Sequence, residues 1–232
     1  MFSIFRSRPT YRKSAFFQGF TDWHCHILPG VDDGVKEFQD ALSILEEYDR
    51  LGVSDVWFTP HIMEDIPNST TLLRKRFEEL SSAWHGNATL HLAAENMLDG
   101  LFVQRLATHD VLPIGIEQRH LLVETSYFNP PVGFHNMLQS IFSAGYYPIL
   151  AHPERYVYMD ENDYTQLHDM GVLFQLNLPS LSGMYGEMAQ EKARMLVKKS
   201  WYHVIGTDLH RPEALQMLLA KRVVRTEIAN AL

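Results

Sequence analysis

The chain has 232 residues, 46% of them hydrophobic, with a net charge of −8 and a single cysteine. This length suits one domain, because a single α/β barrel fills ~200–250 residues, and the apolar content excludes an intrinsically disordered chain. Cys25 alone excludes an internal disulfide and a cysteine-pair zinc site, and the acidity argues against nucleic acid as the main ligand.

The N-terminal segment is basic but lacks the features of a signal peptide. Its cationic residues are Arg6, Arg8, Arg12 and Lys13. The apolar stretch before Arg6 is shorter than the ~7–15 residues of a signal-peptide core, and nowhere does an apolar run reach the ~20 residues of a membrane span. We therefore expect a soluble, cytoplasmic protein. We also expect a solvated basic tail over residues 1–20, able to touch an anionic partner or membrane surface, and a single domain over residues 21–232.

Apolar runs rich in β-branched residues recur along the chain, and each is followed by a turn and a segment with helical spacing. The predicted strands span residues 20–27, 53–60, 88–94, 120–125, 147–151, 172–176 and 203–206. The predicted helices span residues 36–50, a segment after 69 that ends near 84, 133–144, 161–170, 186–199 and 212–221, with weaker helical character over 99–108. This alternation predicts a parallel barrel or a doubly wound sheet.

Each predicted strand ends in polar side chains. In chain order these are His24-Cys25-His26, Thr59-Pro60-His61, Glu95, Glu124-Thr125-Ser126, His152-Pro153-Glu154-Arg155, Asn177 and Asp208-Leu209-His210. In a β/α barrel the C-terminal strand ends converge on one mouth, where such enzymes place their chemistry. An open sheet would instead spread these groups along an edge. The distribution favours a closed or nearly closed barrel of about seven strands.

The first strand ends in a pattern typical of metal sites. His24 and His26 are two residues apart, so both side chains point to the same face and can meet one cation. The turn at 29–34, PGVDDG, adds two carboxylates, including Asp33. None of these signals is specific alone. The turn can equally serve as a helix cap, and His61, which follows Pro60, can equally be a strand-end histidine that hydrogen-bonds to the backbone.

Two carboxylates end largely apolar runs. Glu95 follows LHLAA and Glu124 follows HLLV, and a buried carboxylate without a partner costs several kcal/mol. Each therefore needs a cation nearby. A paired arginine would satisfy either carboxylate, whereas a carboxylate that bridges two metals would satisfy both the electrostatics and the geometry.

The last predicted strands add further donors. His152 is a candidate ligand, and the guanidinium of Arg155 can grip a phosphate through two parallel hydrogen bonds. Asp208 and His210 repeat the same-face spacing of the first motif. The complete set holds five histidines and at least four carboxylates, which suits two or three Mn, Fe or Zn ions better than Mg or Ca.

The other histidines and the cysteine have simpler interpretations. Seven histidines match no strand-end pattern and are interpreted as surface or core residues: His85, His91, His109, His120, His135, His168 and His203. Cys25 has Val rather than Arg six residues later, which excludes the phosphate loop of cysteine-dependent phosphatases. The sequence also contains neither a P-loop nor a dinucleotide-binding glycine fingerprint.

The motifs DWHCHILPGVDDG, TPH, AAE, LVETS, AHPERY and GTDLH occur in this order. Together they resemble the PHP (polymerase and histidinol phosphatase) superfamily and, within it, the bacterial capsular-polysaccharide-type metal-dependent protein-tyrosine phosphatases of the CpsB/CapC class. The resemblance extends from about Thr21 to His210. It implies a distorted (β/α)7 barrel that holds a three-metal centre, usually of manganese.

The resemblance also implies a role for each motif residue. The first metal would be held by His24, His26, Glu95 and Asp208, the second by Glu95, Glu124 and His152, and the third by Asp33, His61 and His210. Arg155 would bind the substrate phosphate. This chain departs from the class at Cys25 and Thr207, where Ser is usual, and in the looser motif AAENML around Glu95.

The implied reaction is hydrolysis of a phosphomonoester by direct in-line attack of metal-bound hydroxide, without a phosphoenzyme. Arg155 would share the equatorial oxygens, and His61 or His210 would assist the leaving phenolate. The implied substrate is the phosphotyrosine cluster of a bacterial tyrosine kinase that controls capsular or exopolysaccharide synthesis. The alternatives are a phosphatase for a small molecule such as histidinol phosphate, and a non-catalytic module that binds the kinase.

Overall fold

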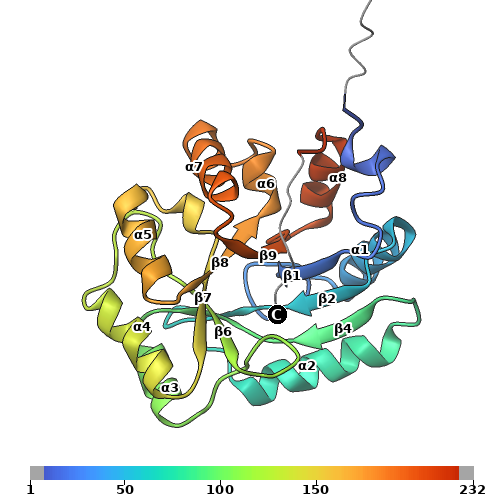
Figure 1. Cartoon of the computed structure of the whole chain (residues 1–232). Coiled ribbons are helices and arrows are strands. Elements are labelled where there is room, and N and C mark those ends of the chain that lie inside the picture. Colours follow the sequence, from blue (N-terminus) through green and yellow to red (C-terminus); the bar gives the residue numbers. More distant parts are fainter. Residues whose placement is uncertain (1–7, 225–232) are drawn as a thin grey trace, which may run out of the picture.

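A computed structural model describes residues 8–224 as parallel strands surrounded by helices (Figure 1). The strands are β1 (Thr21–Cys25), β2 (Asp55–Phe58), β3 (His61–Ile62), β4 (Thr89–Leu92), β5 (Glu95–Met97), β6 (His120–Glu124), β7 (Tyr147–Ala151), β8 (Leu173–Asn177) and β9 (Tyr202–Gly206). The helices are α1 (Phe38–Leu51), α2 (Thr70–Ala83), α3 (Gly100–Ala107), α4 (Phe134–Ser143), α5 (Glu161–Asp169), α6 (Leu178–Leu181), α7 (Glu187–Lys198) and α8 (Pro212–Ala220), with short 3-10 helices η1 (Tyr11–Lys13) and η2 (Pro153–Arg155).

Local sequence signals explain where several helices begin and end. Gly52 ends α1 with a φ of 82°, a left-handed conformation that glycine adopts without a steric penalty. Ser69 begins α2 by accepting a hydrogen bond from the Leu72 amide. Asp160 begins α5 in a capping box with Asp163. The predicted helices are therefore present, with ends shifted by one or two residues.

Two of the predicted strands, 53–60 and 88–94, are each followed by a short second strand that lies beyond the predicted range. The ladder β1-β2-β4 and the ladder β3-β5-β6-β7-β8-β9 consist of parallel pairs. Between β2 and β3 lies Pro60, which has no amide to donate. The neighbouring strand follows the same break, because the Glu95 amide donates to the carbonyls of Thr59 and Pro60 at 3.3 and 3.1 Å. The seven predicted strands are thus present, and β3 and β5 are two additional short strands that the sequence did not predict.

The first and last strands lie side by side at their C-terminal ends. The Asp208 amide donates to the His24 carbonyl at 2.7 Å, and the His26 amide donates to the Leu209 carbonyl at 2.9 Å. These bonds join β1 to the segment after β9 and connect the two ladders. The predicted fold class, a distorted α/β barrel, is confirmed, and the contact between β1 and β9 lies where the polar strand ends gather.

The apolar core has an inner and an outer part. Inside the ring of strands, Trp23 stacks on Trp57 with ring centroids 5.6 Å apart. They pack with a small set of buried aliphatic residues: Ala93, Ile114, Leu122, Ile149, Ala151 and Val204. A larger cluster lies between the strands and the surrounding helices. We call the inner cluster the barrel floor.

The segment before β1 differs from the expected solvated tail. Tyr11 and Phe17 are buried, and the Tyr11 amide donates to the Lys221 carbonyl after α8 at 2.9 Å. Arg12 pairs with Glu47 on α1 at 2.7 Å. These aromatic side chains find enough apolar surface beside α1 and α8 to hold the segment against the barrel, whereas Arg6 lies outside the described residues. Among the helices of residues 8–224, none is both long and apolar enough to cross a bilayer.

Candidate metal centre

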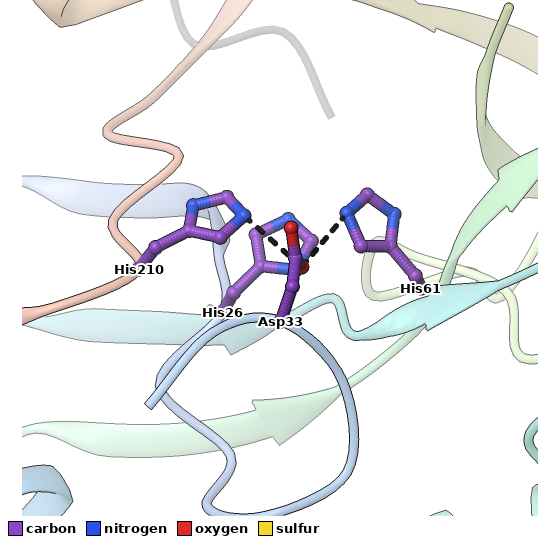
Figure 2. Close-up of side chains that lie close together, drawn as sticks. All are labelled: His26, Asp33, His61 and His210. Atoms are coloured by element: carbon purple, nitrogen blue, oxygen red, sulfur yellow. Dashed lines mark ion pairs between the residues drawn. The ribbon is translucent and has the colours of Figure 1, made fainter. Parts of the chain in front are cut away.

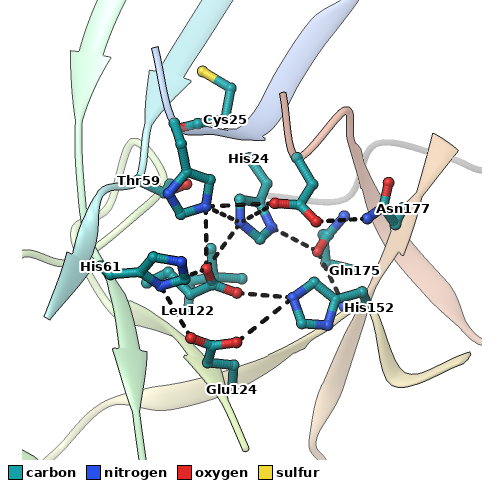
Figure 3. Close-up of polar contacts among 12 residues, drawn as sticks. His24, Cys25, Thr59, His61, Leu122, Glu124, His152, Gln175 and Asn177 are labelled. Atoms are coloured by element: carbon teal, nitrogen blue, oxygen red, sulfur yellow. Dashed lines mark hydrogen bonds and ion pairs between the residues drawn. The ribbon is translucent and has the colours of Figure 1, made fainter. Parts of the chain in front are cut away.

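The C-terminal strand ends bring together all nine side chains that the sequence predicts as ligands (Figures 2 and 3). Their donor atoms form four overlapping groups, within each of which the atoms lie no more than 4.8 Å apart. The groups are His24, His26 and Asp208; His24, Glu95 and His152; His61, Glu95 and Glu124; and His26, Asp33, His61 and His210. The seven histidines interpreted as bystanders belong to none of the groups found in residues 8–224.

The first group lies where β1 meets the segment after β9. The Nε2 atoms of His24 and His26 are 3.1 Å apart. Glu95 Oε2 is 3.2 Å from each of these nitrogens. Asp208 Oδ1 lies 3.5 Å from the first and 3.4 Å from the second. Four donor atoms from three elements therefore face one point.

Hydrogen bonds on the opposite edge of the His24 ring determine its tautomer. Its Nδ1 lies 2.9 Å from Gln175 Oε1. The amide of Gln175 is oriented by two backbone bonds, since its oxygen accepts from the His152 amide and its nitrogen donates to the Leu176 carbonyl. His24 Nδ1 must therefore donate, and Nε2 of the neutral ring carries a lone pair directed at the group.

His26 is held in the same way by a carboxylate. Its Nδ1 lies 2.8 Å from Asp32 Oδ2, and Asp32 is fixed by bonds from the amides of Gly34 and His61. His26 Nε2 thus also carries a lone pair, directed at that of His24. Two lone pairs at 3.1 Å, with two carboxylate oxygens beside them, repel one another unless a proton or a metal ion lies among them. This arrangement fits a metal ion.

Two further groups share Glu95, one with His24 and His152 and the other with His61 and Glu124. Glu95 Oε1 is 3.0 Å from His152 Nε2, and Glu124 Oε2 is 3.9 Å from the same nitrogen. His61 Nδ1 is 3.0 Å from Glu124 Oε1 and 3.2 Å from Glu95 Oε2. These last three atoms are buried without a hydrogen-bond partner within residues 8–224. Buried polar atoms normally find partners, so a cation would satisfy all three.

The outermost group surrounds Asp33 on the loop between β1 and α1 (Figure 2). Its Oδ1 lies 3.4 Å from His61 Nε2 and 3.5 Å from His210 Nε2. His210 Nδ1 donates to the Asp208 carbonyl at 2.9 Å, which leaves Nε2 facing Asp33. The hydrogen bond with His210 lowers the pKa of Asp33 below its usual range. Asp33 is 63% exposed, so this group opens toward solvent.

The clustered carboxylates create a negative electrostatic potential that strongly favours positive charge in the site. Burial by itself would lower the pKa of His24, but Glu95 and Asp208 outweigh it and raise this pKa to about 9. Burial would likewise raise the pKa of Glu95, but His24 and His61 hold it well below its usual value. Protons on the histidines or bound metal ions can supply this positive charge.

Two of the nine residues have a backbone conformation that is rare outside glycine. His152 has a φ of 34° and Asp208 a φ of 52°. Left-handed conformations of such residues cost of order 1–3 kcal/mol and persist only where the surroundings impose them. His152 directly follows β7 and Asp208 comes two residues after the end of β9, and both side chains belong to the metal-binding groups at the mouth.

Arg155, on η2, lies beside the first group. Its Nη1 is 2.5 Å from Asp208 Oδ2, and Asn177 Nδ2 donates to the same oxygen at 2.8 Å (Figure 3). These two bonds occupy Oδ2 and leave Oδ1 to face the histidines. In the described part of the chain the other guanidinium nitrogens have no hydrogen-bond partner, and they are therefore free to bind an anion.

Sequence reasoning missed two residues that hold ligands in place. Asp32 and Asp33 are adjacent in one turn, and the sequence alone does not show which one faces the mouth and which one holds His26. Gln175 lies in the apolar run of β8. A polar residue in a buried strand requires a partner, and that signal could have identified it.

Comparison with known proteins agrees with this geometry. A family model described as "Capsular polysaccharide synthesis, CpsB/CapC" matches residues 20–227. The tyrosine-protein phosphatase YwqE of Bacillus subtilis is 27% identical over 195 residues, covering 82% of this chain and 76% of that protein. The tyrosine-protein phosphatase CpsB of Streptococcus pneumoniae is 27% identical over 225 residues, covering 87% of this chain and 90% of that protein.

A solved structure shares the fold. It comes from work on YwqE of Bacillus subtilis and CpsB of Streptococcus pneumoniae, which are described there as unique metal-dependent tyrosine phosphatases. It superposes with a TM-score of 0.76 at 21% identity, covering 92% of this chain and 99% of that one. The resemblance found in the sequence motifs is thereby confirmed.

Proposed function

Because this chain belongs to the CpsB/CapC family of capsular polysaccharide synthesis, we propose that it is a metal-dependent tyrosine-protein phosphatase. The observation that carries the proposal is the pair of His24 and His26 nitrogens 3.1 Å apart among buried carboxylates, with Arg155 beside them. Relatives that align with most of the chain are named tyrosine-protein phosphatases, which favours phosphotyrosine over histidinol phosphate as the substrate.

The nine side chains would hold two or three ions. The first is assigned to His24, His26, Glu95 and Asp208; the second to Glu95, Glu124 and His152; and the third to Asp33, His61 and His210. Nitrogen and oxygen donors in this mixture suit Mn, with Fe or Zn as alternatives. Divalent cations supply Lewis-acid stabilisation of phosphoryl oxygens and lower the pKa of a coordinated water.

Arg155 is the residue we assign to the substrate phosphate. One guanidinium nitrogen is engaged by Asp208, and those left free can donate to phosphoryl oxygens. A fixed positive charge there stabilises the negative charge of the phosphoryl group as the bond to the leaving oxygen breaks. The guanidinium stays protonated throughout, so its role is to bind and orient the group.

His61 and His210 are the residues we assign to the leaving group. Their side chains are 10% and 25% exposed, whereas those of His24, His26 and His152 are fully buried. They are therefore the site histidines nearest to an incoming phosphotyrosine. A phenol has a solution pKa near ~10, so its departure requires less proton donation than that of an aliphatic alcohol.

The proposed substrate is a phosphotyrosine-containing protein in the cytoplasm, a bacterial tyrosine kinase that regulates capsule or exopolysaccharide synthesis. A negative total charge of −8 does not oppose such a substrate. Four of the chain's acidic residues, Asp33, Glu95, Glu124 and Asp208, are assigned to the metal site, where bound cations would offset them.

The full chain with its metals is the material for the test. Elemental analysis should find two or three transition-metal ions per chain, and EDTA should abolish hydrolysis of a phosphotyrosyl peptide. Addition of Mn should restore it, with Fe and Zn tested in parallel. A metal-free protein that is fully active, or a metal-loaded one that hydrolyses histidinol phosphate faster than the peptide, would contradict the proposal.

A further inference from the structure

The guanidinium of Arg155 lies between two tyrosine rings. Its central carbon is 4.4 Å from the ring centroid of Tyr127 and 4.2 Å from that of Tyr185. Tyr127 lies on the loop between β6 and α4, and Tyr185 lies on the loop between α6 and α7. Three segments far apart in the sequence therefore meet at this arginine. We call Tyr127 and Tyr185 the aromatic clamp.

The two rings of the clamp are supported differently. The Tyr127 ring stacks on the buried ring of Tyr156, with centroids 6.1 Å apart. The Tyr127 carbonyl also accepts a hydrogen bond from the Val157 amide at 2.8 Å. Tyr185 is 40% exposed. The inner ring is thus fixed by the packing of two loops, and the outer ring covers Arg155 from the solvent side.

The clamp and Asp208 together restrict where Arg155 can bind an anion. A guanidinium is planar and donates hydrogen bonds only from its edge. Its central carbon lies over both tyrosine rings, an arrangement in which cation and ring attract each other, and Nη1 is engaged by Asp208. The part of the edge that remains is therefore held in one orientation. A long flexible side chain without such support would have to be ordered each time it bound a phosphate.

We propose that Tyr127 and Tyr185 are positioning residues that orient the Arg155 guanidinium edge-on toward the phosphoryl group of the substrate. This inference rests on the proposed function and names residues that the motif analysis did not identify. The rings act on the phosphate through Arg155, and the hydroxyl groups are dispensable for this role. The expected consequence is an effect on phosphate binding larger than the effect on turnover.

The central experiment compares Tyr185→Leu with Tyr185→Phe in the full, metal-loaded chain. Kinetics on a phosphotyrosyl peptide and calorimetric titration with inorganic phosphate are measured for each, together with metal content. Tyr185→Leu should raise both KM and the dissociation constant of phosphate about tenfold, with kcat changed less than twofold. Tyr185→Phe retains the ring and should recover most of the lost phosphate affinity.

Two further variants test whether the ring acts through the arginine. In an Arg155→Met background, Tyr185→Leu should cause no additional loss of phosphate affinity, because coupled residues are non-additive. Phe128→Leu is the matched control, since Phe128 is 69% exposed and adjacent to Tyr127, and its ring is not among those stacked on Arg155 in the described residues. It should leave both constants unchanged.

Three outcomes would overturn the inference. One is a raised KM for the peptide with unchanged phosphate binding, which would mean that Tyr185 contacts the aryl ring of the substrate instead. The second is a full additional loss in the Arg155→Met background. The third is failure of Tyr185→Phe to recover affinity. If the wild-type protein proved inactive on phosphotyrosine, the proposed function would fail, whereas phosphate titration would still decide the role of the clamp.

Discussion

The two ends of the barrel use the same strands for opposite purposes. At the floor, Trp23 of β1 and Trp57 of β2 stack among aliphatic side chains that include residues of β6, β7 and β9. At the mouth, the strands or the segments after them present histidines and carboxylates, most of which are also buried. Apolar burial at the floor stabilises the fold directly, whereas buried charges at the mouth oppose folding unless they are paired.

This difference separates stability from chemistry along each strand. A substitution at the floor should change the free energy of unfolding and leave the site intact, and a substitution at the mouth should do the reverse. The strained backbone of His152 and Asp208 belongs to the mouth. We therefore expect the apolar packing of the floor and the outer core to offset the free-energy cost of the strained backbone and the buried charges at the mouth.

The largest effect is expected for Glu95→Gln at the mouth. Glu95 lies within 3.2 Å of nitrogen atoms of four histidines, and the amide removes its charge at nearly constant volume. Loss of a metal site forfeits several kcal/mol of transition-state stabilisation, on the order of 10⁴-fold in activity. Phosphatase kinetics and elemental analysis measure this.

The control for Glu95→Gln is His91→Gln near the other end of the strands. His91 pairs with Asp55 and stacks on Trp57, and it lies outside the metal-binding groups of the described chain. Its substitution should leave metal content unchanged. Full metal occupancy and activity in Glu95→Gln would contradict the assignment of Glu95 as a bridging ligand.

Trp57→Ala tests the floor. The buried indole stacks on Trp23, and its removal leaves a cavity that should lower the free energy of unfolding by about 4 kcal/mol. Urea denaturation measures the loss. Metal content per folded chain should equal that of the wild type. A folded variant that has lost its metals would contradict the proposal that floor residues determine stability and mouth residues determine metal binding.

Asp32→Asn should have an intermediate effect at the mouth. The amide group would present a donor to His26 Nδ1, where the carboxylate accepts at 2.8 Å, and would thus disfavour the tautomer that leaves Nε2 free. Loss of such a partner lowers metal affinity about 10–100-fold. Metal titration measures it, with the exposed Asp65→Asn as control; equal affinities would show that Asp32 has no orienting role.

The smallest effect concerns Glu154, a buried residue that precedes Arg155 in the chain. Its carboxylate accepts from the Asn177 amide and the Tyr202 hydroxyl, and burial outweighs these bonds and raises its pKa. Because the pKa of Glu154 is higher in the folded than in the unfolded protein, protonation of this carboxyl stabilises the folded state. The contribution is complete at a pH below the unfolded-state pKa and is lost as the pH rises through the folded-state pKa.

The wild type should therefore lose stability relative to Glu154→Gln by up to about 1.4 kcal/mol per pH unit between those two values. Urea denaturation of both proteins across this pH range, with chelator present throughout, measures the difference. A difference that does not change with pH would show that Glu154 does not titrate in the folded protein.

Much of the fold could be predicted because its signals are local. The segment 147–151 was identified to the residue as β7, since its apolar run is bounded by turn residues. The short strand β3 after Pro60 and the buried position of Tyr11 were not predicted. Both depend on neighbours that are distant in sequence, namely the strand beginning at Glu95 and the residues around Lys221.

The sequence by itself determined the alternation of strands and helices and the polar groups at the strand ends, since periodicity and spacing are properties of short segments. Only the tertiary structure decided that Asp32 holds His26 while Asp33 faces His61 and His210, that Gln175 orients His24, and that two tyrosines lie against Arg155. The physical reason is that these contacts arise where loops from different strands converge, and the contact between β1 and β9 brings them together.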